Sequence, residues 1–116
     1  MPITIYHNPK CATSRATLKL LRDRGLEPVV IEYLKTPPSR AALANLLKLL
    51  ELKPRALLRI KEPEYKKAKL DNPKLPDSAI LAALVKYPKL IERPIVVVNN
   101  KKAALGRPPE NVLKIL

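Results

Sequence analysis

Three hydrophobic patterns at the start of the chain limit its possible folds more than any other feature. Alternating apolar residues over 2–6 predict a strand, and an amphipathic pattern over about 12–24 predicts a helix that ends at Gly25. A continuous apolar run over 28–33 predicts a second strand, buried on both faces. Together they predict a βαβ unit with parallel strands. The apolar face of its helix is expected to comprise Ala16, Leu18, Leu20 and Leu21.

The middle of the chain has the pattern of several short helices. Ser39 is a predicted N-cap, Pro54 fits the first turn of a short helix, and Asp77 opens a helix that Pro88 closes. One further helical turn is expected between loops over 61–76. The inward residues of the helix after Asp77 are predicted to be Ile80, Leu81, Leu84 and Val85. We interpret residues 36–87 as a helical block inserted into an α/β framework.

The strand pattern returns near the end of the chain. Residues 94–98 are mostly β-branched, and 102–105 can pair with them as an antiparallel strand before Gly106. Pro108 and Pro109 then start a last helix. The order β-α-β, helices, β-β-α predicts an α/β thioredoxin-like fold with a mixed four-stranded sheet, in one domain over 1–116.

Composition limits where the protein works and what it binds. A single cysteine in 116 residues excludes an intrachain disulfide, and no segment resembles a signal peptide or a membrane span, so a cytoplasmic protein without membrane association is expected. The net charge of +13 would attract phosphate-like anions, nucleic acid or an acidic protein. With four tyrosines as the only aromatic residues, however, stacking on single-stranded nucleic acid is not expected.

Cys11 lies where the first strand passes to the first helix. Unpaired amides and the helix dipole favour a thiolate there. The local motif is C-A-T-S, so Ser14 occupies the place of a resolving cysteine, and a second thiol must come from outside the chain. His7, if protonated, would further favour the thiolate. The alternatives are an inert buried cysteine and a surface histidine. One cysteine and one histidine cannot complete a zinc site, so no metal is expected.

Five segments in order, HNPKCATSR, TPPSR, RALLR, ERPIVVV and GRPPE, resemble the glutathione- and glutaredoxin-coupled arsenate reductases over essentially the whole chain. The first segment spans His7 to Arg15; its Ala12 departs from the glycine that well-known members have after the nucleophile. The resemblance implies that Cys11 attacks arsenate and that His7 helps to keep it a thiolate. It also implies a cis peptide bond before Pro94. The implied ligands of the oxyanion are Arg59, Arg93 and Arg107.

The resemblance further implies glutathione as co-substrate, glutaredoxin as protein partner and no bound cofactor. Two other functions stay open on the sequence. The chain could be a glutathione-dependent thiol oxidoreductase with another substrate, although a disulfide substrate does not need three arginines. It could also be a non-catalytic thioredoxin-fold regulator that binds a protein partner, although such regulators usually have a C-x-x-C pair that is missing here.

Overall fold

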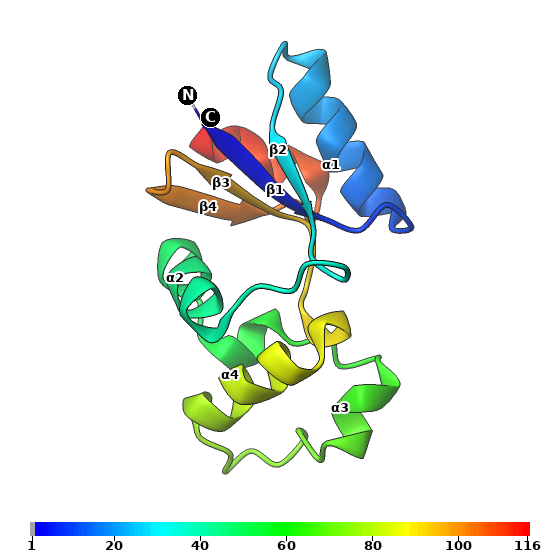
Figure 1. The fold of residues 1–116 in the computed structure, drawn as a ribbon, viewed down its shortest axis with the longest axis vertical. Helices are drawn as coiled ribbons and strands as arrows, with labels where there is room; N and C mark the ends of the chain where they lie inside the picture. The colour runs from blue at the N-terminus through cyan, green and yellow to red at the C-terminus, as the bar shows by residue number, and fades with distance from the viewer. Residues whose placement is uncertain (1) are drawn as a thin grey trace. The chain divides into compact units, whose positions relative to one another are not determined.

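The computed structural model describes residues 2–116, which form two compact units. The sheet unit comprises the chain up to Thr36 together with Arg93–Leu116, and the helical unit comprises Pro37–Glu92 (Figure 1). The block interpreted as an insertion therefore corresponds to a unit of its own. It extends beyond the predicted end at residue 87, because Ile91 forms a β-bridge with Leu58.

The sheet unit contains four strands and two helices. In chain order these elements are β1 (Ile3–His7), α1 (Ala12–Asp23), β2 (Val29–Glu32), β3 (Ile95–Val98), β4 (Lys102–Leu105) and the 3₁₀ helix η3 (Pro109–Ile115). The strand order is β2-β1-β3-β4. β1 is parallel to β2, whereas β3 is antiparallel to both β1 and β4. This arrangement confirms the predicted thioredoxin-like mixed sheet.

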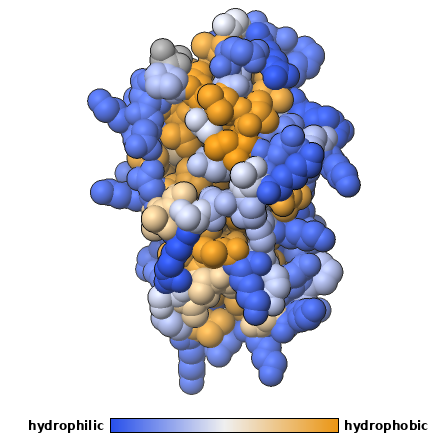
Figure 2. Space-filling view, in the orientation of Figure 1, coloured by the Kyte–Doolittle hydropathy of each residue, from blue (hydrophilic) through white to orange (hydrophobic). Residues whose placement is uncertain are grey.

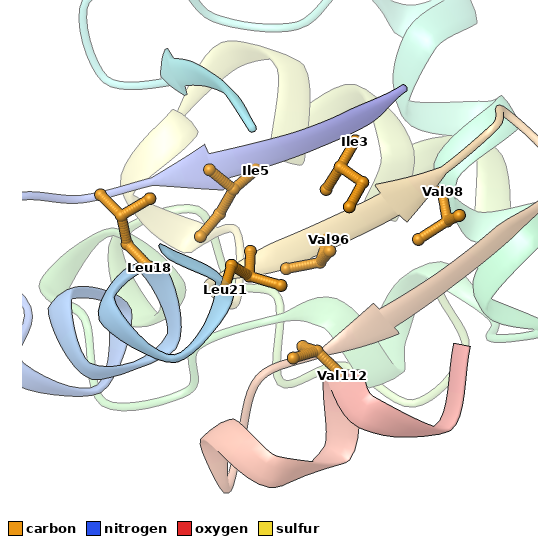
Figure 3. Packing of buried hydrophobic residues seen from close by; sticks show 7 residues of the cluster. All are labelled: Ile3, Ile5, Leu18, Leu21, Val96, Val98 and Val112. Carbon is orange, nitrogen blue, oxygen red and sulfur yellow. The ribbon is translucent and has the colours of Figure 1, made fainter. Parts of the chain in front are cut away.

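The core of the sheet unit lies between one face of the sheet and the helices α1 and η3 (Figure 3). Side chains alternate between the faces of a strand, so every second residue of β1 and β3 points to this core. The cluster comprises Ile3, Ile5, Leu18, Leu21, Val96, Val98 and Val112. His7 continues the buried row of β1, and the core therefore directs its imidazole to the side of the sheet on which α1 packs.

In this unit, one predicted burial pattern is wrong, and another is wrong in part, since Leu18 and Leu21 of α1 are buried as predicted. β2 is not buried on both faces: Val29 is 63% exposed, because β2 is an edge strand. Hydrophobic residues are visible at the surface among hydrophilic ones (Figure 2). In α1, Ala16 is exposed and Thr17 is fully buried. The buried face of α1 comprises Ser14, Thr17, Leu18 and Leu21, so it is more polar than the leucine pattern predicted.

The helical unit follows its predicted order. Its elements are α2 (Arg40–Leu50), the 3₁₀ helix η1 (Pro54–Leu57), α3 (Pro63–Lys67), α4 (Asp77–Lys86) and the 3₁₀ helix η2 (Pro88–Leu90). Ser39 caps α2 by accepting a hydrogen bond from the N–H of Ala42, as predicted. In α4, Ile80 and Leu84 are buried as expected, but Ala83 is the third buried residue. Within residues 2–116, no helix is long and apolar enough to span a membrane.

Candidate active site

The strand register brings three chain segments to one end of the sheet, where β1 and β4 finish and β3 begins. Tyr6 near the end of β1 pairs with Ile95 at the start of β3, and Ile95 pairs with Leu105 at the end of β4. The loop before α1, the segment before β3 and the segment after β4 therefore all lie at this end of the sheet. These segments contain Cys11, Arg93 and Arg107, respectively.

Gly106 allows these segments to pack closely. A Cβ atom at this position would lie 2.6 Å from Thr17 Oγ1 and 2.8 Å from Pro94 Cγ. The Gly106 N–H donates a 2.9 Å hydrogen bond to the Pro94 carbonyl. The Arg93–Pro94 bond is cis, which confirms the expectation from the resemblance, and Arg107–Pro108 is cis as well. Close backbone contact thus joins α1, β3 and the segment after β4.

Cys11 is the N-cap residue of α1 and is 9% exposed. Its N–H donates to the Asn8 carbonyl, and its own carbonyl accepts from the Arg15 N–H, both at 3.0 Å. The Cys11 side chain makes no ordinary capping hydrogen bond. The first N–H groups of the helix nevertheless point their positive ends toward the N-cap position, which is where the sulfur lies.

These surroundings favour the thiolate form of Cys11. Burial by itself would raise the pKa of the thiol, but the N–H of Ser14, the charge and hydrogen bonding of the Arg93 guanidinium, and the N–H of Thr13 outweigh it, so the pKa lies below its ordinary value. In apolar surroundings, an inert cysteine would have a pKa above its ordinary value. Cys11 is therefore suited to act as a nucleophile.

His7 binds Ser14 in the first turn of α1. Its Nδ1 lies 2.6 Å from Ser14 Oγ, which also accepts a 3.0 Å hydrogen bond from the Asn8 N–H. Burial lowers the pKa of His7, and the guanidinium groups of Arg22 and Arg15 lower it further, against an opposing effect of Glu32. The lowered pKa favours the neutral imidazole, which binds the first turn of α1 through Ser14. The role of His7 in keeping Cys11 a thiolate stays a prediction.

The other predicted residues of the sheet unit also lie at this end. Arg107 is exposed, and its Nη1 donates to the backbone carbonyl of Arg93 at 3.3 Å. Arg15 Nη1 donates to the Pro9 carbonyl at 2.9 Å and so holds the loop before Cys11. Pro94 is buried. Cys11, Arg93 and Arg107 together offer a nucleophile and two guanidinium groups.

Arg59 is part of the helical unit and has acidic partners there. Its Nη1 lies 2.6 Å from Glu62 Oε1, and its Nε lies 3.9 Å from Glu92 Oε1. All three side chains are about three-quarters buried (24%, 23% and 26% exposed). Its role as an oxyanion ligand stays a prediction. Among residues 2–116, no three His, Cys, Asp or Glu side chains gather as a metal site would require.

Two contributors to the site were not predicted from the sequence. Asn8 binds Cys11 through its carbonyl and Ser14 through its N–H, and its side-chain Oδ1 accepts from the Lys10 N–H at 3.0 Å. The N-P pair in this loop is a turn motif that could have indicated such a role. Thr17 contacts Gly106; no local pattern indicates a contact between residues so distant in sequence.

Comparison with known proteins gives the site its family context. Residues 6–115 match the model of the ArsC family. The chain belongs to the ArsC family. A solved structure described as an arsenate reductase from Vibrio cholerae is 52% identical, with a TM-score of 0.96 over 100% of this chain and 98% of that one. This likeness and the family match agree with the thioredoxin-like fold.

Two ArsC relatives differ in how they are named. An arsenate reductase of Neisseria meningitidis serogroup A is 46% identical over 98% of this chain and 97% of its own length. The protein named "Uncharacterized protein YfgD" of Escherichia coli K12 is 50% identical over 98% of this chain and 96% of its own. The chain thus spans nearly the full length of both relatives.

Proposed function

We propose that this protein reduces arsenate to arsenite, with Cys11 as the nucleophile. The single observation that supports this most is the Arg93 guanidinium beside the Cys11 sulfur, at a helix N-terminus that lowers the thiol pKa. The same positive groups that stabilise a thiolate also suit a tetrahedral oxyanion. The names of the Vibrio and Neisseria relatives point to arsenate as that oxyanion.

In the first step, the Cys11 thiolate attacks the arsenic atom. An As–S bond forms and an As–O bond breaks; the leaving oxygen takes up protons and departs as water. Arg93 and Arg107 would hold the remaining oxygens, because guanidinium groups bind such anions in fixed geometry. The resemblance also implies Arg59 as a third ligand, which stays a prediction.

In the second step, glutathione supplies the electrons. Its thiolate attacks the Cys11 sulfur, an S–S bond forms, and the S–As bond breaks with its electron pair remaining on arsenic, which becomes trivalent. Glutaredoxin then attacks the glutathione sulfur of the mixed disulfide and releases the Cys11 thiolate. External thiols are required because the chain has one cysteine. A reducing cytoplasm would supply them.

An enzyme-coupled assay tests this function directly. Arsenate-dependent NADPH oxidation is measured with glutathione, glutaredoxin and glutathione reductase present. We expect turnover for the wild-type chain and a loss of roughly a thousandfold or more for Cys11→Ser, with unchanged circular dichroism. Turnover by Cys11→Ser would contradict the assignment of the nucleophile.

The coupled assay without glutaredoxin, and with a glutathione mixed disulfide in place of arsenate, separates the alternatives. A chain that reduces a glutathione mixed disulfide but not arsenate would be a thiol oxidoreductase with another substrate. A chain that does neither, although its thiol reacts with iodoacetamide, would fit a regulator that binds a protein partner.

A further inference from the structure

A groove along α1, which the chemistry above does not use, begins close to the active site. Its volume is ≈ 450 Å³, within the range of small-molecule sites, which is about 300–1,000 Å³. It lies entirely within the sheet unit. The residues that line it are His7, Pro9, Arg15, Leu18, Lys19 and Arg22, with Asp23 at the end of the helix.

Backbone contacts connect this groove to the Cys11 loop. Residues three, four and seven positions apart share one face of a helix, so Arg15, Leu18 and Arg22 form a single stripe of α1. At the start of this stripe, the Arg15 N–H donates to the Cys11 carbonyl, and Arg15 Nη1 donates to the carbonyl of Pro9, which also lines the groove. One end of the groove therefore lies beside the loop that holds Cys11.

The groove has an excess of positive charge. Three of its lining residues are cations and one, Asp23, is an anion. Lys19 binds Asp23 at 2.6 Å, but these side chains are 76% and 59% exposed. Arg22 is paired with Glu27, which is 72% exposed, at 3.4 Å. Exposed ion pairs of this kind are weak, so the cations can reorient toward an anionic ligand.

The charges of Arg15 and Arg22 lower the pKa of His7, and the carboxylate of Glu32 raises it. Charged groups of both signs therefore lie near His7, at this end of the groove. Leu18 and Pro9 add an apolar surface. A ligand with carboxylates, one ammonium and a short aliphatic body would match these groups.

We propose that this groove binds the small carboxylate-bearing thiol that attacks the Cys11 adduct. This inference rests on the proposed function for its reaction, but its chemistry follows from the single cysteine, which makes an external thiol necessary. The cations at Lys19 and Arg22 hold carboxylates of the thiol compound. Its sulfur then reaches the Cys11 sulfur from the N-terminal end of the stripe.

A disulfide-exchange experiment tests the groove without arsenate. Cys11 is converted to a mixed disulfide with thiopyridine. A thiolate that attacks the Cys11 sulfur forms a new S–S bond and displaces thiopyridone, whose absorbance gives a second-order rate constant. Glutathione, which has two carboxylates and one ammonium, is compared with mercaptoethanol, which is uncharged.

The variant is Lys19→Gln combined with Arg22→Gln. The matched control, which also removes two positive charges, is Lys101→Gln combined with Lys102→Gln, two exposed lysines where the turn after β3 leads into β4. We expect the double variant to lose about three- to tenfold in rate with glutathione, as for two exposed charge contacts, and less than about twofold with mercaptoethanol. The control is expected to keep both rates.

Three results would overturn the proposal. Equal losses with both thiols would mean that the substitutions change the reactivity or folding around Cys11. Equal losses in the double variant and the control would mean diffuse attraction by the +13 net charge. No loss with glutathione would mean that the groove does not bind it. Because no arsenate is present, each result is independent of whether the chain reduces arsenate.

Discussion

Arg93 of the sheet unit and Arg59 of the helical unit were predicted from the same kind of motif but lie in different surroundings. Arg93 acts on the Cys11 thiol, in a region held by buried hydrogen bonds and close backbone packing. Arg59 lies between the carboxylates of Glu62 and Glu92. The two motifs do not show this difference in partners, and substitutions should separate the two regions.

The largest effect in this comparison is expected for Arg93→Ala. The variant loses a charge-assisted hydrogen bond to the sulfur and one guanidinium for the oxyanion, so kcat/KM for arsenate should fall about ten- to a hundredfold. The pKa of Cys11 should rise toward its ordinary value, because one of the groups that lower it is removed. Iodoacetamide alkylation over a pH series measures the second effect.

Lys101→Ala is the control. Lys101 is an exposed residue of the sheet unit, in the turn between β3 and β4, at the opposite end of these strands from Arg93 and Arg107. It should change kcat/KM by less than about twofold. Similar effects in both variants would mean that Arg93 acts only through the overall positive field.

Close packing in the sheet unit is probed by Gly106→Ala. The added methyl would collide with Thr17 and Pro94, and both are buried and cannot move aside. We expect a loss of about 1–3 kcal/mol in the free energy of unfolding, measured by urea denaturation. In a double-mutant cycle, Thr17→Ala should relieve part of this loss, since it removes Oγ1 and Cγ2. Strictly additive losses would contradict the steric explanation.

Ion pairing in the helical unit is probed by Glu62→Gln. The pair with Arg59 is short and partly buried, so its loss should lower the free energy of unfolding by about 1–2 kcal/mol. The matched control is Asp23→Asn, which breaks a pair of equal length between exposed side chains. That change should stay within about 0.5 kcal/mol. If the two variants were equally destabilised, burial would not be what distinguishes the Arg59 pair.

The sequence predicted the order of elements well because local pattern determines them. Ser39 and Gly25 have the cap and the positive φ that local pattern predicts, whereas the cis bond before Pro94 was implied by the resemblance. The prediction that β2 is buried on both faces was wrong, because its apolar run resembles that of a central strand. Only the sheet order shows that β2 lies at an edge.

The sequence suggested candidate site residues but not the contacts that they make. Cys11 follows from its position before α1. The binding of His7 to Ser14, in contrast, depends on the packing of β1 against α1, and the binding of Arg59 to Glu92 joins residues far apart in sequence. The groove along α1 is an intermediate case. The spacing of Cys11, Arg15 and Arg22 is visible in the sequence, but only the structure shows that Arg15 and Arg22 line a groove.

The smallest expected effect is on the pH dependence of the free energy of unfolding. It depends on His7, the only histidine of the chain, which lies in the sheet unit. Burial lowers the pKa of His7 in the folded chain, so around the unfolded pKa of about 6.5 the unfolded chain binds more protons. The contribution of His7 to stability is therefore complete above that pKa and is lost as the pH falls through it toward the lower folded pKa.

His7→Asn isolates this contribution, because asparagine keeps an acceptor for Ser14 and does not titrate. Urea midpoints are compared between about pH 7.5 and about pH 5, where carboxylates affect both chains alike. The wild-type chain should lose more stability than His7→Asn over this interval. Equal losses would mean that His7 has the same proton affinity in both states, and the neutral imidazole bound to Ser14 would then not describe the site. Since the helical unit has no histidine, this difference arises in the sheet unit.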